Sequence, residues 1–247
     1  MPATIDVLGD RPKRVLILAS NPATSPTTGW PVGFWWSELT HPYWAFTERG
    51  YRVDIASLEG GALIADQWSD PRDESGYAAE DLLSLGFLSS PAHAGLLERS
   101  PRLADLELDA YDACFLVGGQ GPMVTFRGNA EVEALLRTFL ESGRPAAVVC
   151  HATCALLDAT GSDGSPLVAG RTWTGFANSE EDAAVAFVGR PIQPFRIEDE
   201  ARVMPGTNFI VRGAFRSHAV RDGGLITGQQ QHSGGAAAAL VIEALGA

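Results

Sequence analysis

Short apolar runs alternate with longer amphipathic segments along this chain. The first three runs span residues 14–20, 51–57 and 112–119, and each is rich in small and β-branched residues. Such runs are typical of parallel strands that are covered on both faces. Between the first two, residues 34–50 have apolar positions at helical spacing and end at a glycine. A strand, a helix and a strand over this length predict a right-handed βαβ unit.

The most regular helical pattern lies in the middle of the chain. Apolar residues recur at helical spacing over residues 132–140, and this amphipathic helix is predicted to end at Gly143. A fourth strand follows at residues 145–149 and leads into a helix-competent segment. The order of elements predicts an α/β fold with a mostly parallel sheet between helices. Two late strands are expected at residues 209–212 and 225–227. Two late helices are expected, one starting at Glu180 and one over residues 233–245.

Three stretches depart from this pattern. Residues 1–12 are polar with two prolines and are predicted to form a loose N-terminal arm. Residues 21–32 are rich in Pro, Thr and Gly, which predicts a loop. Residues 60–110 mix acidic residues with short apolar clusters, which indicates helices and loops at the edge of the fold. Because no repeat or linker interrupts the pattern, residues 1–247 are expected to form a single domain.

Composition and charge narrow the class of protein. A chain of 247 residues with 45% hydrophobic residues buries a core without a disulfide or a structural metal. Its formal charge of −12 argues against nucleic acid or an anionic membrane as the main partner. Three cysteines are too few for a disulfide framework, and no apolar run approaches the roughly 18 residues that span a bilayer. We therefore expect a cytoplasmic protein that acts on a small molecule.

The fourth strand ends at Cys150 and His151. A buried strand that turns sharply into a helix presents the residue at the corner and directs the free N–H groups of the helix toward its ligand. The positive end of that helix would favour a thiolate, so Cys150 is the candidate nucleophile. The alternative is a buried core cysteine, which is the role expected for Cys114 and Cys154. A metal site at Cys150 and Cys154 lacks a second cluster of ligands.

His151 and Glu38 are the candidate proton-transfer groups. His151 is either a surface or capping residue or a base that a carboxylate orients. Adjacent side chains at such a corner point apart, so a direct bond between Cys150 and His151 is not required. Glu38 is either a solvated residue at a helix start or a carboxyl group whose pKa is raised by Trp35 and Trp36. In the second case Glu38 would bond a thiolate or relay a proton.

Gly118 and Gly119 end the third strand, at the sheet edge where parallel strands bind ligands. A glycine pair is commonly a turn, but here its N–H groups would form an oxyanion hole together with that of His151. The side chains of Trp35, Trp36 and Gln120 are predicted to line a small pocket at the same edge.

Taken together, five motifs in this order resemble the DJ-1/ThiJ/PfpI superfamily, specifically its Hsp31-like branch within the class I glutamine-amidotransferase-like fold. The resemblance extends from about Arg14 to the C-terminus. The motifs are Glu38 with His41-Pro42-Tyr43, Val117-Gly-Gly-Gln-Gly-Pro, Val149-Cys-His-Ala, Thr174-Gly-Phe-Ala-Asn-Ser-Glu-Glu181 and Asp222-Gly-Gly-Leu-Ile-Thr-Gly-Gln229.

This resemblance implies a flavodoxin-like, doubly wound sheet sandwiched by helices, with Cys150 on a nucleophile elbow. It further implies that Glu38 lies against the sulfur and that His151 is oriented by Glu181 or Glu180. Members of the branch convert methylglyoxal to lactate without glutathione, cofactor or metal, and many members of the superfamily are homodimers. Others are described as deglycases, chaperones or stress-response proteins.

Departures from the family pattern leave other functions open. Gln120 stands where the family usually has histidine, Ala152-Thr153 replace Gly-Pro, and residues 228–233 differ from the usual late motif. A hydratase or amidase acting on another small electrophile, such as an isonitrile or amide, is one alternative. A redox-sensing stress protein or chaperone, with Cys150 as its oxidisable group, is another. A glutamine amidotransferase is disfavoured because no histidine has a glutamate two residues later.

Overall fold

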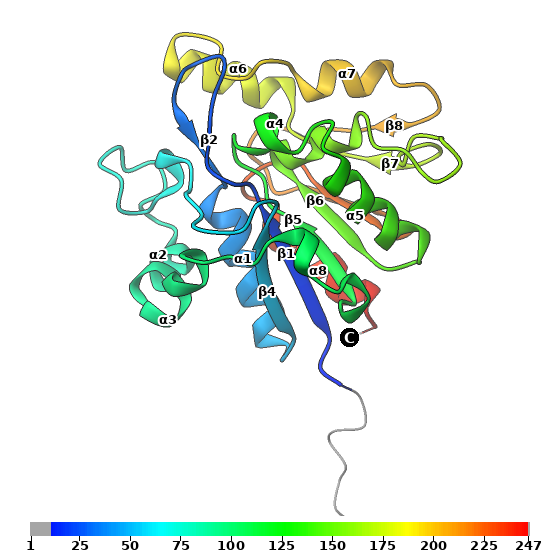
Figure 1. Ribbon diagram of the computed structural model, residues 1–247. Helices are drawn as coiled ribbons and strands as arrows, with labels where there is room; N and C mark the ends of the chain where they lie inside the picture. Colours follow the sequence, from blue (N-terminus) through cyan, green and yellow to red (C-terminus); the bar gives the residue numbers. More distant parts are fainter. Residues whose placement is uncertain (1–10, 247) are drawn as a thin grey trace, which may run out of the picture.

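The computed structural model describes residues 11–246, which form a six-stranded sheet between two layers of helices (Figure 1). The strand order is β4-β1-β5-β6-β10-β9, and all neighbours are parallel except the antiparallel edge pair β10 and β9. Taken in chain order, the parallel strands lie in the order 2-1-3-4-5, which confirms the flavodoxin-like arrangement. The strands are β1 (Arg14–Ala19), β4 (Arg52–Ser57), β5 (Ala113–Leu116), β6 (Ala146–Val149), β9 (Ala219–Asp222) and β10 (Leu225–Gly228).

Helices cover both faces of this sheet. Helix α5 (Ala130–Glu141) lies on one face, and α1 (Trp36–Glu48) and α8 (Gly234–Ala244) pack together on the other (Figure 1). The central strands β5 and β6 are buried along their whole length, because a parallel sheet has no solvent-facing side. In α5 the periodic apolar residues are the buried ones, and the side chain of Asn129 caps the helix by accepting two backbone N–H groups.

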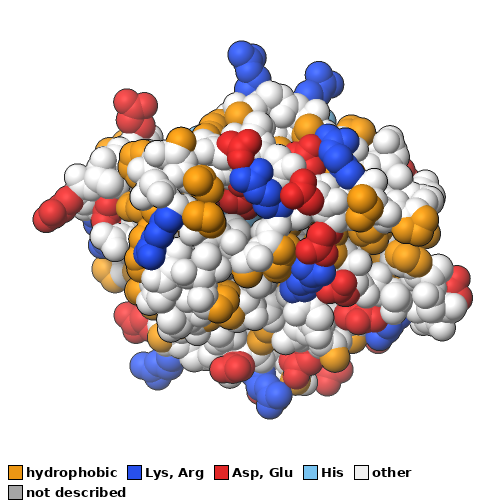
Figure 2. Space-filling model, turned by 90° about the horizontal axis from the view of Figure 1, so that it is seen from above, with side chains coloured by type: hydrophobic (Ala, Val, Ile, Leu, Met, Phe, Trp, Pro, Cys, Tyr) orange, Lys and Arg blue, Asp and Glu red, His pale blue; other side chains and the backbone are white. Residues whose placement is uncertain are grey.

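Shorter helices surround this framework. Helices α6 and α7 lie beyond the carboxyl ends of the strands, at the top of Figure 1. Viewed from above, this end has acidic and basic side chains scattered among apolar ones, with neither sign dominant (Figure 2). The shorter helices are η1 (Gln67–Ser69), α2 (Leu82–Ser89), α3 (Pro91–Ala94), η2 (Gly95–Leu97), η3 (Leu103–Asp105), η4 (Leu108–Ala110), α4 (Pro122–Thr125), η5 (Cys150–Leu156), α6 (Asn178–Val188) and α7 (Ile197–Val203).

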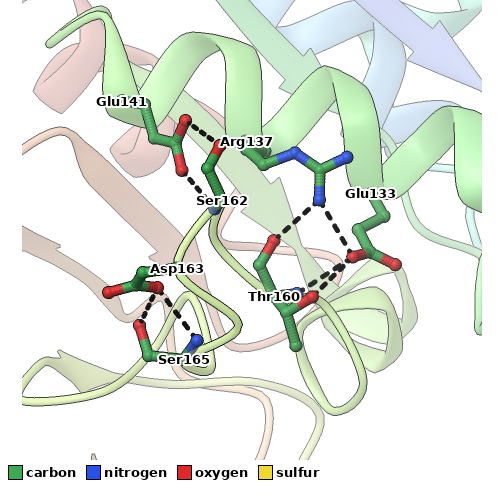
Figure 3. Close-up of polar contacts among 7 residues, drawn as sticks. All are labelled: Glu133, Arg137, Glu141, Thr160, Ser162, Asp163 and Ser165. Carbon is green, nitrogen blue, oxygen red and sulfur yellow. Dashed lines mark hydrogen bonds and ion pairs between the residues drawn. The ribbon is translucent and has the colours of Figure 1, made fainter.

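The polar face of α5 anchors the loop that follows η5 (Figure 3). Glu133 accepts hydrogen bonds from the backbone N–H and the hydroxyl of Thr160, and Arg137 donates to the Thr160 carbonyl at 3.1 Å. Further along α5, Glu141 accepts from the N–H and hydroxyl of Ser162 at 2.7 and 2.8 Å. These bonds fix the start of the segment that leads from the sheet edge to α6.

The helix-competent segment after β6 forms a 3₁₀ helix. Other local predictions were wrong. Residues 21–32 include a small hairpin of β2 (Ala23–Thr24) and β3 (Pro31–Val32). The strand predicted at 209–212 is reduced to β8 (Asn208–Phe209), which pairs with β7 (Thr172–Trp173) outside the main sheet. Strand β9 was missed because it contains charged residues and has no apolar run. An edge strand is partly exposed, so its sequence need not be apolar.

The N-terminal arm predicted at residues 1–12 lies outside the described residues except for Arg11 and Pro12. Within residues 11–246, no helix has the length and hydrophobicity needed to span a bilayer.

Candidate active site

The candidate residues meet at the carboxyl edge of the sheet, where β1 lies between β4 and β5. Glu38 follows β1 on α1, Gly118 follows β5, and Cys150 follows β6. The chain turns sharply at Cys150, whose φ of 56° lies in the left-handed region. Among the non-glycine residues described, Cys150 shares this conformation only with Phe215, and both line one cavity. Strained backbone of this kind is typical of functional sites.

The Cys150 sulfur is enclosed by hydrogen-bonding groups. The backbone N–H groups of His151 and Gly119 face it, His151 Nδ1 is its side-chain hydrogen-bond partner at 3.4 Å, and the Glu38 carboxyl group lies close enough to act on its pKa. Burial raises the pKa of the Cys150 thiol well above its usual value, and the charge of Glu38 raises it further. The N–H group of His151, at the start of this helix, lowers the pKa of the thiol, as expected, but burial and the charge of Glu38 outweigh it, so the thiolate is not favoured overall.

Glu38 is fully buried in the first turn of α1, so the solvated alternative for this residue is wrong. Its Oε2 atom accepts a hydrogen bond from the Gly118 N–H at 2.9 Å, and the Cys150 thiol is its other polar neighbour. Desolvation raises the pKa of Glu38 to about 7. A Cβ atom at Gly118 would lie 2.5 Å from Glu38 Oε2 and 2.7 Å from the Cys150 Cβ, so only glycine fits between them.

Glu38 and Cys150 therefore compete for protons in one dry compartment. When the carboxyl group is ionised, its charge opposes ionisation of the thiol; when it is protonated, it donates a hydrogen bond that stabilises a thiolate. The two groups titrate as a pair rather than independently. Transfer of the thiol proton to the Glu38 carboxylate generates the thiolate nucleophile without releasing a proton to solvent.

His151 contacts both the thiol and a second carboxylate. Its Nδ1 atom lies 3.4 Å from the Cys150 sulfur, and its Nε2 atom lies 3.0 Å from Glu181 Oε1. The ring stacks on Phe176 with the ring centroids 3.9 Å apart. When Nε2–H donates a hydrogen bond to the Glu181 carboxylate, the neutral ring presents the lone pair of Nδ1 to the sulfur.

Glu180 has a different set of partners. It accepts the N–H groups of Ala177 and Phe215 at 2.9 and 3.0 Å and the side-chain amide of Gln229 at 2.8 Å. Of the two glutamates that the sequence left open, Glu181 is the one that contacts His151.

A cavity of about 260 Å³ opens beside the thiol. Trp35 and Gln120 line it, as expected, but Trp36 does not. Trp36 starts α1 with its side chain turned into the core, where it packs on Phe34 with ring centroids 4.9 Å apart. Consecutive residues at a helix start point in different directions, so only one of the two tryptophans reaches the site.

A model of the DJ-1/PfpI family matches residues 33–244, most of the chain. The chain belongs to the DJ-1/PfpI family. The probable glutathione-independent glyoxalase hsp3103 of Schizosaccharomyces pombe is 28% identical, over 87% of this chain and 90% of that protein. The glutathione-independent glyoxalase HSP31 of Saccharomyces cerevisiae is 24% identical, over 95% and 98%. These relatives support the Hsp31-like branch that the motifs predicted.

Solved structures agree with this membership. The Rapid Encystment Protein of 24 kDa from Francisella tularensis superposes with a TM-score of 0.83 at 26% identity, covering 94% of this chain and 99% of that one.

One carboxyl group at the site was not predicted. Asp66 is 2% exposed and accepts the N–H groups of Gly33 at 3.0 Å and Gln120 at 2.5 Å, and burial raises its pKa to about 7. It thereby ties the turn after β5 to the segment that precedes Trp35. The one sequence feature that could have indicated a buried position for Asp66 is the short apolar run directly before it. Asp66 was instead grouped with the exposed acidic residues of 60–110.

Cys114 and Cys154 are fully buried, as expected, and burial raises the pKa of both thiols. Within residues 11–246, no group of three or more His, Cys, Asp or Glu side chains is arranged to hold a metal ion.

The raised pKa of Glu38 predicts a pH-dependent stability. The unfolded chain ionises this group near 4.5, whereas the folded protein keeps the proton up to about pH 7. Between these values the folded state binds more protons, so raising the pH destabilises it. Glu38→Gln removes the titration and keeps an acceptor for the Gly118 N–H. The free energy of unfolding of the variant, relative to wild type, should rise by up to about 3 kcal/mol from pH 4.5 to pH 7.

Urea unfolding at closely spaced pH values measures this difference. Glu98→Gln, at an exposed position, is the matched control and should follow the wild-type curve. A Glu38→Gln difference that stays constant with pH would show that the buried carboxyl group has an ordinary pKa.

Proposed function

We propose that this protein is a cysteine-dependent, glutathione-independent glyoxalase that converts small 2-oxoaldehydes, such as methylglyoxal, to 2-hydroxy acids. The observation on which this rests is the Cys150 sulfur held between the Glu38 carboxyl group, whose pKa is about 7, and the His151–Glu181 pair. The reaction moves a proton between two adjacent carbons, which requires acid–base groups that exchange protons near neutral pH. Relatives named as glutathione-independent glyoxalases support the same reaction.

The first step is attack of the Cys150 sulfur on the aldehyde carbon. A carbon–sulfur bond forms, the thiol proton passes to Glu38 or His151, and the aldehyde oxygen becomes an oxyanion. The N–H groups of Gly119 and His151, which point at the sulfur, are placed to donate to that oxygen. Protonation of the oxyanion gives a hemithioacetal.

The second step is an internal redox reaction. A base removes the hydrogen from the former aldehyde carbon, giving an enediolate, and the adjacent carbon is then protonated. The first carbon is oxidised to a thioester while the second is reduced to a hydroxyl-bearing carbon, so no external oxidant is needed. Water then cleaves the thioester, which releases the 2-hydroxy acid and restores the thiol. Glu38 is the base best matched to this transfer, because its pKa lies near the working pH.

Independence from glutathione agrees with the lining of the cavity. No lysine or arginine of residues 11–246 lines it, so neither carboxylate of glutathione would find a cationic partner there. A volume of about 260 Å³ is also small for a tripeptide adduct. We further propose that the protein acts as a homodimer in the cytoplasm, as its family resemblance and composition imply.

A hydrolase or amidase is the second candidate. The contacts from Cys150 to His151 and from His151 to Glu181 resemble a nucleophile, base and orienting group for acyl transfer. Such a reaction needs no proton transfer between carbons and therefore no neutral-pH acid at Glu38. Simple redox sensing is less well supported, since a buried thiol with a raised pKa is slow to oxidise.

Replacement of the nucleophile tests the proposed function. Cys150→Ala should lower kcat/KM for lactate formation from methylglyoxal by about 10³-fold or more, the scale expected for loss of a covalent nucleophile. Cys154→Ala, on the same 3₁₀ helix, is the matched control and should stay within a few-fold of wild type. Lactate formation is followed by chromatography. Equal rates for wild type and Cys150→Ala would eliminate the cysteine mechanism.

The two neighbouring glutamates offer a second test. Glu181→Gln should lower kcat about 100-fold with little change in KM, because an amide in place of the carboxylate no longer holds His151 in one tautomer. Glu180→Gln should lower the free energy of unfolding instead, because Glu180 accepts three hydrogen bonds that fix the start of α6. Steady-state kinetics and urea unfolding of both variants separate the two effects, and the reverse pattern would contradict the assignment of Glu181.

A further inference from the structure

Four aromatic side chains form one wall of the cavity beside Cys150. These residues, here termed the aromatic wall, are Trp35, Trp68, Tyr77 and Phe187. Adjacent rings meet edge to face: the centroids are 5.9 Å apart for Trp35 and Tyr77, and 5.5 Å apart for Trp68 and Phe187. Tyr77 and Phe187 are 6.5 Å apart and connect the two pairs. The wall therefore joins three separate chain segments around one space.

The aromatic wall is not packed as a core would be. Phe187 is 66% exposed and Tyr77 is 49% exposed, although both line the cavity that contains the thiol. Large apolar side chains held open to solvent around a concave space are typical of a ligand site. An apolar ligand in this cavity would remove part of that surface from water, and the edge-to-face geometry offers ring faces and edges to another aromatic group.

The cavity is larger than methylglyoxal requires. An apolar protein cavity of roughly 150 Å³ is enough to bind benzene. The cavity here is about 260 Å³, so it accommodates an aromatic ring together with the two carbonyl groups of an aldehyde. The methyl group of methylglyoxal would leave most of the aromatic wall in contact with water.

The polar groups of the cavity favour an uncharged ligand. No lysine or arginine in residues 11–246 lines it, and its acidic group, Glu181, is engaged with His151. The surface at the sheet-edge end also lacks a patch of one sign that would steer an anion (Figure 2). Gln120 supplies a neutral amide, and its buried Oε1 atom has no hydrogen-bond partner among the described residues.

We propose that the preferred substrate is an uncharged 2-oxoaldehyde with an aryl group, of which phenylglyoxal is the simplest, rather than methylglyoxal. The proposal rests on the glyoxalase function above and names its substrate class. Cys150 adds to the aldehyde carbon, the hydrogen of that carbon moves to the ketone carbon, and water releases mandelate. One water is consumed and no other reactant enters. The aryl ring lies against the aromatic wall.

The test compares three substrates at initial rates, with the hydroxy acids measured by chromatography. Wild type should convert phenylglyoxal with a kcat/KM at least about tenfold above that for methylglyoxal, the low end of discrimination by an apolar pocket. 4-Carboxyphenylglyoxal adds a charged para substituent to phenylglyoxal, and it should be at least about tenfold poorer than phenylglyoxal because no cationic residue that lines the cavity receives the carboxylate.

The two aldehydes also differ in intrinsic reactivity, which would affect the ratio of their kcat/KM values. A substitution in the aromatic wall changes the pocket contacts and leaves that reactivity unchanged. Phe187→Ala should lower the ratio of kcat/KM values for phenylglyoxal and methylglyoxal about fivefold, the scale of one lost aromatic pair. Because Phe187 is highly exposed, this change should leave the fold intact. Val203→Ala, at an 80% exposed position of α7 outside the cavity lining, is the control and should leave the ratio unchanged.

The outcomes distinguish the two proposals. A methylglyoxal preference, or a ratio that Phe187→Ala does not alter, would overturn the aryl substrate class and leave the glyoxalase function standing. Absence of hydroxy acid from every 2-oxoaldehyde would overturn the glyoxalase function and the substrate class with it.

Discussion

The buried carboxyl group of Glu38 is the constraint on which the site depends. An ionised carboxylate in a dry compartment is costly unless it is hydrogen-bonded, and here the carboxyl group accepts one hydrogen bond, from the Gly118 N–H, with the Cys150 thiol as its other polar neighbour. Both partners come from the ends of other strands, so the contact exists only when the ends of β1, β5 and β6 meet at one edge. The same contact requires glycine at position 118, because any side chain would displace the carboxyl group from the sulfur.

The rest of the fold holds this contact in place. The parallel strands fix the three loop origins, and Asp66 ties the turn after β5 to the segment before Trp35 by accepting a backbone N–H group from each. The residues 60–110, which lie beside the sheet, thus do more than cover an edge. They provide Asp66, which accepts the Gly33 and Gln120 N–H groups, and Trp68 and Tyr77 on the cavity wall, so one segment contributes to both the turn after β5 and the cavity.

Much of the framework could be predicted from the sequence. Strands such as β1 and β6 are largely apolar and helix α5 is strictly periodic, and these patterns arise from burial itself. The convergence of Glu38, Gly118 and Cys150 followed from the rule that parallel strands end at a common edge. Asp66, Tyr77 and the inward turn of Trp36 could not be predicted, because they depend on how distant segments pack. The raised pKa of the thiol also depends on depth of burial, which the local pattern at Cys150 does not reveal.

The central claim is that Glu38 and Cys150 titrate as one pair. The rate at which iodoacetamide alkylates Cys150, measured by mass spectrometry across pH, tests it directly. In wild type the rate should first rise with an apparent pKa of about 7, when the pair loses its first proton and part of the population becomes thiolate beside a protonated Glu38. In Glu38→Gln that step should be absent, leaving one rise at the pH of an isolated buried thiol. An identical step near pH 7 in both proteins would contradict the account.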